Sequence, residues 1–285
     1  MEAKTTEILA RAKKGEQAVG AFNIFDNLTL RAVARAADRL GVPAVIQVSV
    51  RTARAIGPRL IRDMFAAAAA EVRVPLSLHL DHCPDLAVID AVIDAGWSSV
   101  LFDASDRDLD EAKALTADVV HRAHDHGVEV ESEIENIVGV EDGVGSNVIA
   151  HAYSEELLVE IAEETHVDLL APQLGTAHGR YQSKPKLLPR RVERLVQLTD
   201  RPIVLHGGTG LSGDQFRSFI RAGVTKINVS TAVKTTYLSS MRDVLADRLP
   251  RDLWEPLPVF DLVGRAVEDE IAAHMAVFAC RSEEE

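Results

Sequence analysis

The sequence predicts an α/β protein with the fold of a TIM or (β/α)8 barrel and an extra C-terminal helix. Short apolar runs rich in β-branched residues alternate with longer segments of helical period, and eight such pairs follow one another. Eight βα units in 285 residues suit one barrel, and no linker or shift in composition divides the chain. We therefore expect a single barrel domain over residues 1–285.

The expected strands are mostly apolar through their bodies, as in parallel sheets covered on both faces. They span residues 18–24, 43–49, 75–82, 98–105, 127–134, 167–173, 202–207 and 226–231. The expected helices lie between them, over residues 28–40, 59–72, 86–95, 109–125, 155–165, 190–198, 214–222 and 231–248. The extra helix is expected at about residues 262–280.

The composition excludes several classes of protein. With 31 Lys and Arg against 44 Asp and Glu, the net charge of −13 argues against a nucleic-acid binder or a protein of anionic membrane surfaces. The longest purely apolar stretch, residues 64–70, is far shorter than the roughly 20 residues of a membrane helix. We expect a cytoplasmic protein whose two cysteines, Cys83 and Cys280, form no disulfide scaffold.

Three histidines lie at or just beyond the ends of expected strands. His82 follows the third strand, His178 the sixth, and His206 ends the seventh. The carboxyl ends of barrel strands meet at one mouth, so three imidazoles from distant positions would meet there and hold a catalytic zinc with room for substrate oxygens. The other seven histidines, such as His121 and His124, are expected to be solvated helix residues.

A glycine-rich loop, His206-Gly207-Gly208-Thr209-Gly210, follows the seventh expected strand. Glycines let backbone N–H groups approach an anion, and the loops after strands 7 and 8 form the recurrent phosphate site of this fold. The eighth strand ends on Asn228-Val229-Ser230-Thr231, which adds amide and hydroxyl groups at the same place.

Carboxylates complete the expected mouth. Asp81 and Asp103 end the third and fourth strands, and Glu131 and Glu133 share one face of the fifth strand because they are two residues apart. Residues 135–150, which include Glu141, carry three glycines and no clear period, as is typical of a functional lid. These groups are candidates for moving protons on a bound substrate.

With these motifs in this order, the chain resembles the class II, metal-dependent fructose- and tagatose-bisphosphate aldolase family. The resemblance covers residues 18–234 and runs through 21–23, 79–82, 99–103, 130–133, 139–143, 175–181, 206–210 and 228–231. It implies a lyase that cleaves or forms a phosphorylated ketose, with dihydroxyacetone phosphate as donor and a zinc-stabilised enediolate. It also implies a homodimer or homotetramer acting in carbohydrate metabolism.

The resemblance assigns roles position by position. It implies Zn²⁺ on His82, His178 and His206, and an alternative outward divalent site on Asp103 and Glu133. Glu141 would take the C–H proton of dihydroxyacetone phosphate, and Asp81 would exchange a proton with the aldehyde-derived hydroxyl. The substrate and phosphate set would be Asn23, Ser49, Gly179, Gly207, Gly208, Thr209, Asn228, Ser230 and Thr231, with a monovalent cation such as Na⁺ or K⁺ near Gly179 and the 207–209 loop.

The chain departs from the family pattern at three places. Glu135 stands where glycine is usual, and Ala171-Pro172-Gln173-Leu174 replaces a small apolar strand end. No Asp-Pro-Arg segment follows the eighth strand, where the family presents an arginine to a second phosphate. These departures favour an unphosphorylated or unusual aldehyde as the partner of dihydroxyacetone phosphate.

Two alternatives to a zinc aldolase remain at this point. A Schiff-base aldolase needs a desolvated lysine at the carboxyl end of a strand, whereas Lys226 starts the eighth expected strand. A barrel of the same family with altered aldehyde specificity, or one that binds sugar phosphate without aldolase activity in a biosynthetic pathway, is the second alternative.

Overall fold

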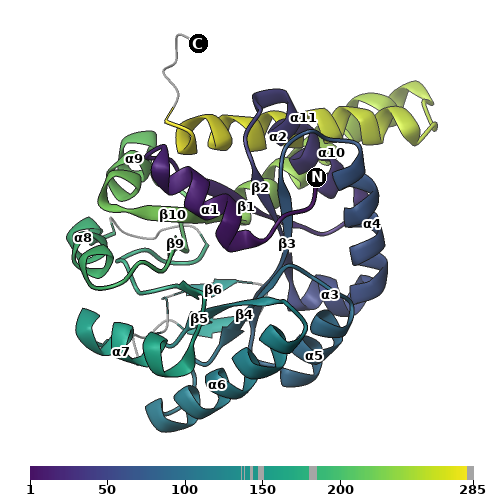
Figure 1. The fold of residues 1–285 in the computed structure, drawn as a ribbon. Coiled ribbons are helices and arrows are strands. Elements are labelled where there is room, and N and C mark those ends of the chain that lie inside the picture. The colour runs from purple at the N-terminus through teal and green to yellow at the C-terminus, as the bar shows by residue number, and fades with distance from the viewer. Residues whose placement is uncertain (136, 138, 142–143, 147–150, 180–184, 281–285) are drawn as a thin grey trace.

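The computed structural model describes residues 1–285 except 136, 138, 142–143, 147–150, 180–184 and 281–285. Its eight parallel strands close into a barrel in the order β1-β10-β9-β8-β5-β4-β3-β2 (Figure 1). The barrel strands are β1 Val19–Ile24, β2 Ala44–Ser49, β3 Leu76–Cys83, β4 Ser99–Asp103, β5 Glu129–Glu133, β8 Leu169–Leu170, β9 Ile203–Leu205 and β10 Val224–Val229. The predicted fold class is confirmed.

Helices surround the barrel. They are α1 Thr5–Lys14, α2 Asn27–Leu40, α3 Val50–Ile56, α4 Pro58–Ala70, α5 Leu86–Asp94, α6 Leu109–Asp125, α7 Glu155–Thr165, α8 Pro189–Leu198, α9 Gly213–Ala222, α10 Thr231–Arg248 and α11 Leu257–Phe278, with a 3₁₀ turn at Leu249–Arg251. The bounds of α6, α7 and α10 match those expected. The final helix begins earlier than expected, because Pro256 and Pro258 lie at its start, where proline is tolerated.

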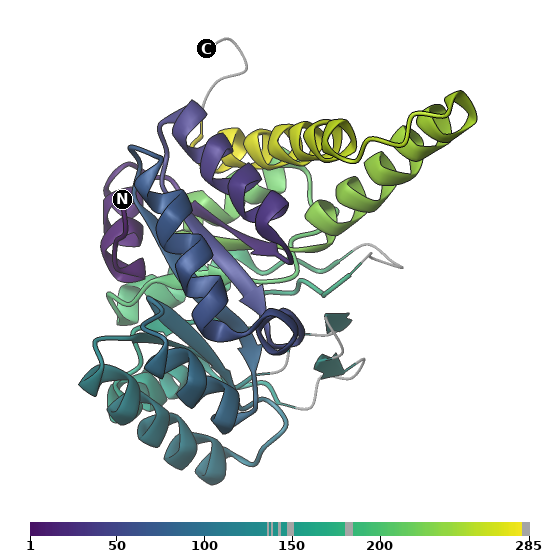
Figure 2. The ribbon, with the colours of Figure 1, turned by 90° about the vertical axis from the view of Figure 1, so that its right-hand side faces the viewer.

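Two helices and a hairpin were not predicted. Helix α1 covers the amino end of the barrel, and α3 follows β2 directly, with the Ser49 hydroxyl accepting a hydrogen bond from Thr52 N–H at its start. Strands β6 Gly139–Glu141 and β7 Val144–Ser146 pair antiparallel on the opposite side of the barrel from α1 (Figure 2).

The inside of the barrel has an apolar layer and polar layers. The apolar cluster comprises Ile8, Leu9, Ala12, Val19, Ala21, Val45, Leu169, Ala171 and Val204, so that α1 plugs the amino end against four strands. Beneath it, the Thr5 hydroxyl lies 2.7 Å from Ser99 Oγ and donates to Ser77 Oγ at 3.2 Å. The carboxyl end is lined by ionisable groups instead.

Helices α10 and α11 form an arm that projects from the barrel on the same side as the β6–β7 hairpin (Figure 2). Large apolar side chains are exposed along this arm: Leu238, Leu249, Leu253, Trp254, Leu257, Phe260 and Leu262. Within the described residues, no helix has both the length and the apolar content needed to cross a membrane.

Candidate active site

The end of β3 is irregular, and this irregularity sets the direction of His82. The pairing of β3 with β4 shifts between Leu80 and Cys83, and His82 has φ +42°, in the left-handed region that non-glycine residues rarely adopt. Neighbouring residues of a regular strand would face opposite sides of the sheet. Here both Asp81 and His82 are buried at the mouth, and His82 Nε2 lies 3.8 Å from Asp81 Oδ1.

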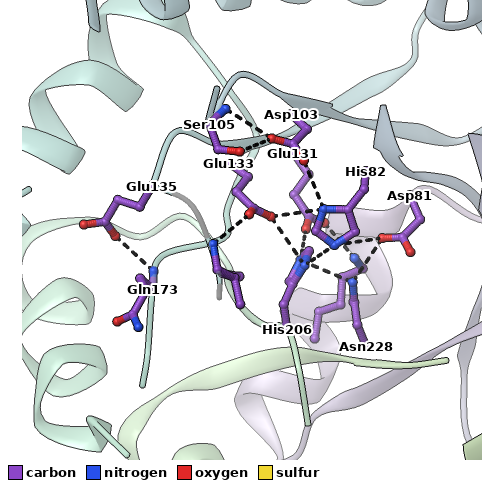
Figure 3. A network of polar contacts seen from close by, with 12 residues as sticks. Asp81, His82, Asp103, Ser105, Glu131, Glu133, Glu135, Gln173, His206 and Asn228 are labelled. Atoms are coloured by element: carbon purple, nitrogen blue, oxygen red, sulfur yellow. Dashed lines mark hydrogen bonds and ion pairs between the residues drawn. The ribbon is translucent and has the colours of Figure 1, made fainter. Parts of the chain in front are cut away.

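The three predicted histidines meet at the carboxyl end of the barrel. The His82 ring centroid lies 4.7 Å from that of His206 and 4.8 Å from that of His178, and both ring pairs are edge-on. His206 Nδ1 lies 2.9 Å from His82 Nε2 (Figure 3). All three rings are buried, and one nitrogen of each lies within 4.8 Å of the others.

Two carboxylates reach the other nitrogen of His82. Asp103 Oδ2 from β4 and Glu133 Oε2 from β5 each lie 3.3 Å from His82 Nδ1. Glu133 Oε2 is also 3.6 Å from His206 Nδ1, and this buried oxygen accepts no hydrogen bond from the described residues. His82, Asp103 and Glu133 thus form a second group whose ligand atoms lie within 4.8 Å of one another.

Glu131 orients His206 from inside the barrel. Its Oε1 lies 2.8 Å from His206 Nε2, and its Oε2 accepts a 2.7 Å bond from Lys226 Nζ. The Glu131, Lys226 and His79 side chains are all fully buried. A carboxylate on the outer nitrogen of a histidine fixes its orientation for a metal on the inner nitrogen.

Sequence reasoning named Glu131 as a candidate carboxylate of the mouth, but it missed that His79 and Lys226 join it inside the barrel. His79 was grouped with solvated helix histidines, but it points into the barrel, where Nδ1 lies 2.8 Å from Ser99 Oγ. The spacing of Ser77, His79 and Asp81 at every second residue of β3 would have indicated it. Lys226 lies inside β10, which begins at Val224, and its ammonium is held by Glu131 in the middle of the barrel. A Schiff-base role at the mouth is excluded by this placement.

Asp81 is held by amides. Asn23 Nδ2 donates to Asp81 Oδ2 at 2.9 Å, and Asn228 Nδ2 lies 3.4 Å from Asp81 Oδ1 (Figure 3). Gln47 Nε2 in turn donates to Asn23 Oδ1 at 2.8 Å. Asp81 therefore has a fixed orientation beside the histidines.

Burial and neighbouring charges shift the pKa values of His82 and His206 in opposite directions. Burial alone would lower the pKa of His82, yet Asp81 and the two carboxylates at its Nδ1 raise the pKa well above its usual value. Burial lowers the pKa of His206 to about 3, against the opposing effect of its bond to Glu131. The two neighbouring imidazoles are thus shifted in opposite directions, His82 toward its charged form and His206 toward its neutral form.

The pKa values of Glu131 and Glu133 are also shifted in opposite directions. Burial would raise the pKa of Glu131, but Lys226 and His206 hold the pKa far below its usual value. Burial raises the pKa of Glu133 well above its usual value, with Asp103 adding to the effect. These two carboxyl groups, two residues apart on one strand, thus have pKa values shifted in opposite directions, because only Glu131 has a buried lysine as its partner.

The predicted phosphate loops touch each other through their backbones. Gly207 has φ +65°, and a Cβ built on it would lie 2.6 Å from the Ala177 carbonyl carbon and oxygen, next to His178. A Cβ on Gly208 would lie 2.9 Å from the Phe216 ring. Glycine is therefore required here by close approach as well as by conformation.

Within the part of the chain that the structure describes, three buried polar atoms around these loops have no hydrogen-bond partner: Thr176 Oγ1, Asn228 Oδ1 and Ser230 Oγ. Ser230 immediately precedes α10, an 18-residue helix whose first residue is Thr231. Unpaired buried polar groups are costly and mark sites where a ligand supplies the missing partner. Beside a helix N-terminus they suit an anion.

The remaining predicted residues fall at the same mouth, with one exception. Ser49 ends β2, Gly179 has φ +78° in the loop after His178, and Thr209 lies in the turn before α9. For Glu141, the structure describes the backbone in β6, and its side chain lies outside what is described. The donor set of histidines and carboxylates, with the unpaired Glu133 oxygen, fits a divalent metal ion such as zinc.

The fold and this cluster define a class of protein: a (β/α)8 barrel with a histidine and carboxylate centre at its mouth. The family model of class-II fructose-bisphosphate aldolase matches residues 3–283. The chain belongs to this family, and it is an aldolase, a lyase.

Two relatives illustrate the range of the family. The fructose-bisphosphate aldolase of Geobacillus stearothermophilus is 37% identical over 249 residues, which cover 84% of either chain. The 6-phospho-5-dehydro-2-deoxy-D-gluconate aldolase of Bacillus subtilis is 34% identical over 282 residues, covering 95% of this chain and 93% of the relative.

Solved structures show the same fold. A structure from Coccidioides immitis, described as a candidate fructose-1,6-bisphosphate aldolase, has a TM-score of 0.89 at 26% identity and covers 96% of both chains. The YdjI aldolase of Escherichia coli K12 has a TM-score of 0.85 at 24% identity over 100% of both chains.

Proposed function

We propose that this aldolase reversibly cleaves a phosphorylated ketose, with dihydroxyacetone phosphate as the donor half and zinc as the metal. The observation that carries the proposal is the convergence of His82, His178 and His206 beside the Gly207 loop. Metal ligands and a phosphate cradle adjoin at one mouth, as a phosphorylated donor requires.

His82, His178 and His206 would hold Zn²⁺, and Asp103 with Glu133 would hold a metal in the alternative outward position. Zinc supplies a positive charge that polarises the carbonyl and hydroxyl oxygens of the donor. Glu131 keeps His206 in place from behind. A monovalent cation such as Na⁺ or K⁺ would lie near Gly179 and the 207–209 loop.

The donor phosphate would bind at the loops after β9 and β10. Backbone N–H groups and the α10 N-terminus attract an anion without a basic surface. The residues in this role would be Gly179, Gly207, Gly208, Thr209, Asn228, Ser230 and Thr231, with Asn23 and Ser49 nearer the reacting carbons. Binding at this distance from the chemistry fixes the donor in a reactive orientation.

Two carboxylates would move the protons. Glu141 takes the C–H proton beside the donor carbonyl, and the electron pair of that bond moves into the carbonyl group. Asp81 protonates the aldehyde-derived oxygen in condensation, and it accepts the hydroxyl proton in cleavage. Its amide partners Asn23 and Asn228 hold it in that orientation.

The acceptor would be an aldehyde without a phosphate. The substrates named for the two relatives are both phosphorylated ketoses. The 6-phospho-5-dehydro-2-deoxy-D-gluconate of the second relative has a carboxylate at the end of the molecule where fructose bisphosphate has its other phosphate. Residues 230–238, which follow β10, contain no arginine for a second phosphate.

The α10–α11 arm would join copies of this chain in a homodimer or homotetramer. Trp254 is 70% exposed and Leu257 66%, and large apolar side chains exposed close together in the chain are typical of an interaction site. A sedimentation measurement on Trp254→Glu and Leu257→Glu checks it: dissociation is expected with the barrel intact. A cytoplasmic location fits the free thiols of Cys83 and Cys280.

The test of the function separates its two proton steps. Glu141→Ala should lower deuterium exchange into dihydroxyacetone phosphate by about 10²–10⁴-fold and spare zinc and phosphate binding, because it removes only the base. Asp81→Ala should spare exchange but suppress carbon–carbon cleavage. Cleavage and synthesis are then measured with aldehydes bearing a phosphate, a carboxylate or neither. A wild-type protein that binds zinc and the donor but catalyses neither exchange nor cleavage would instead be a binding barrel.

A further inference from the structure

A second buried ionic cluster lies outside the histidine site, at Glu135. Glu135 follows β5 by two residues and is fully buried, yet it points away from the histidines toward Gln173 (Figure 3). Its Oε1 accepts bonds from Arg191 Nη2 at 2.9 Å and Tyr153 N–H at 2.7 Å. Its Oε2 accepts from Arg191 Nη1 at 3.0 Å and Gln173 N–H at 2.9 Å. The carboxylate is thus fully satisfied.

Arg191, in the first turn of α8, uses its whole guanidinium in the same cluster. Beyond Glu135, it donates to the backbone oxygens of Gln173 at 2.7 Å and Tyr153 at 2.6 Å, and its Nε donates to Glu155. Gln173 and Tyr153 are therefore each held at both the N–H and the C=O. A planar fork with five donors is the one side chain that meets this arrangement.

The barrel has few paired backbone residues at β8, the strand next to the cluster of Glu135 and Arg191. Strand β8 has only two residues, paired with Glu131 and Ser132 of β5, and a single registered pair joins it to β9, Leu170 with Ile203. Beyond β8, the Ala171 N–H still donates to Ser132, and the next link to the end of β5 is Gln173 to Glu135.

Each side of this link leads to a candidate metal ligand. Glu133 precedes Glu135 by two residues, and His178 follows Gln173 in a loop where the Gln173 side chain accepts from Gly175 N–H. The ion pair therefore replaces a missing stretch of ladder between the segments that carry Glu133 and His178. Neither Glu135 nor Arg191 is itself a ligand.

We propose that Glu135 and Arg191 are positioning residues of the metal centre, which act by holding the loop of His178 against the end of β5. This rests on the proposed zinc binding. Outer groups that orient ligands typically contribute 10–100-fold to metal affinity. A loop tied at Gln173 presents His178 in one place, whereas an untied loop spends part of its time elsewhere.

The test uses Arg191→Lys, which keeps the buried positive charge but loses the fork. The matched control is Arg194→Met, which removes the exposed pair of Arg194 with Glu156 between the same two helices, α7 and α8. Zinc affinity by chelator competition should fall about 10–100-fold in Arg191→Lys and stay at the wild-type value in Arg194→Met. Glu135→Gln should give a loss in the same direction.

Two further measurements separate positioning from general damage. In a His178→Ala background, Arg191→Lys should cause no additional loss of zinc affinity, because its route to the metal is gone. In the metal-free protein, Arg191→Lys should speed amide exchange of residues 171–178 while leaving β2 and β3 as in wild type. Wild-type zinc affinity in Arg191→Lys, or an equal loss in the His178→Ala background, would overturn the assignment. A wild-type protein without zinc affinity would overturn the proposed function as well.

Discussion

Both ends of the barrel interior contain buried polar groups, but these groups are satisfied differently at the two ends. At the amino end, Thr5 bonds Ser77 and Ser99, and Glu129 accepts from the Thr6 N–H and hydroxyl. At the carboxyl end, Glu133, Asn228 and Ser230 each keep a buried oxygen that has no hydrogen-bond partner among the described residues. A closed set of hydrogen bonds stabilises the fold, whereas an open set is where a ligand completes the bonding.

The largest effect is expected from a substitution in the histidine cluster at the carboxyl end of the barrel. His206→Ala removes a central nitrogen of the cluster, and we expect loss of stoichiometric zinc and a fall in kcat/KM of more than about 10³-fold, since metal polarisation contributes several kcal/mol. Metal analysis and a coupled cleavage assay measure both. Retention of zinc with full activity would remove His206 from the metal site.

A smaller effect on zinc binding is expected at Glu131, which lies behind His206 inside the barrel. Glu131→Gln should weaken zinc binding about 10–100-fold, because His206 loses its orienting carboxylate, and should lower the free energy of unfolding by about 3–5 kcal/mol, because Lys226 loses its partner. Adding Lys226→Met should restore stability but not zinc affinity. Equal recovery of both would show that Glu131 acts on the fold alone.

The pH dependence of zinc binding should follow the proton at His82. The pKa of His82 is raised well above 6.5, so zinc must displace a proton, and affinity should rise about tenfold per pH unit until the folded-state pKa is passed. In the metal-free protein, the free energy of unfolding should instead fall as pH rises. Stability from protonated His82 is complete below the unfolded-state pKa and is lost as pH rises through the folded-state value. Zinc titrations and denaturant unfolding over a pH series measure both, and pH-independent zinc affinity would contradict the expectation.

The smallest effect on activity is expected at the closed end. Thr5→Val keeps the shape but removes a hydroxyl that bonds both Ser77 and Ser99, which should cost about 1–3 kcal/mol of unfolding free energy. Zinc affinity and kcat/KM should match the wild-type values. A loss of zinc affinity here would mean that the two ends of the barrel are coupled.

The sequence was sufficient for the number and order of the barrel strands, because buried parallel strands are continuous apolar runs and their polar ends stand out. It was wrong about the length of the sixth strand, which was expected over residues 167–173 and spans only Leu169–Leu170. It was sufficient for the meeting of His82, His178 and His206, because the fold brings strand ends together. It was insufficient for Lys226, since a charged residue inside an apolar strand cannot be explained until its partner, Glu131, is known. The Glu135 pair was also out of reach, because Arg191 lies far along the chain and joins it only in the folded barrel.

The close approach of Gly207 to Ala177 ties the proposed phosphate loop to the loop that carries His178. Any larger residue at position 207 would push the backbone next to His178. Under the proposed function, a change that adapts the phosphate loop would therefore also move the candidate metal ligand His178, so that donor recognition and metal placement would change together. New substrate preferences are more accessible through the acceptor side, which this backbone contact leaves free to vary.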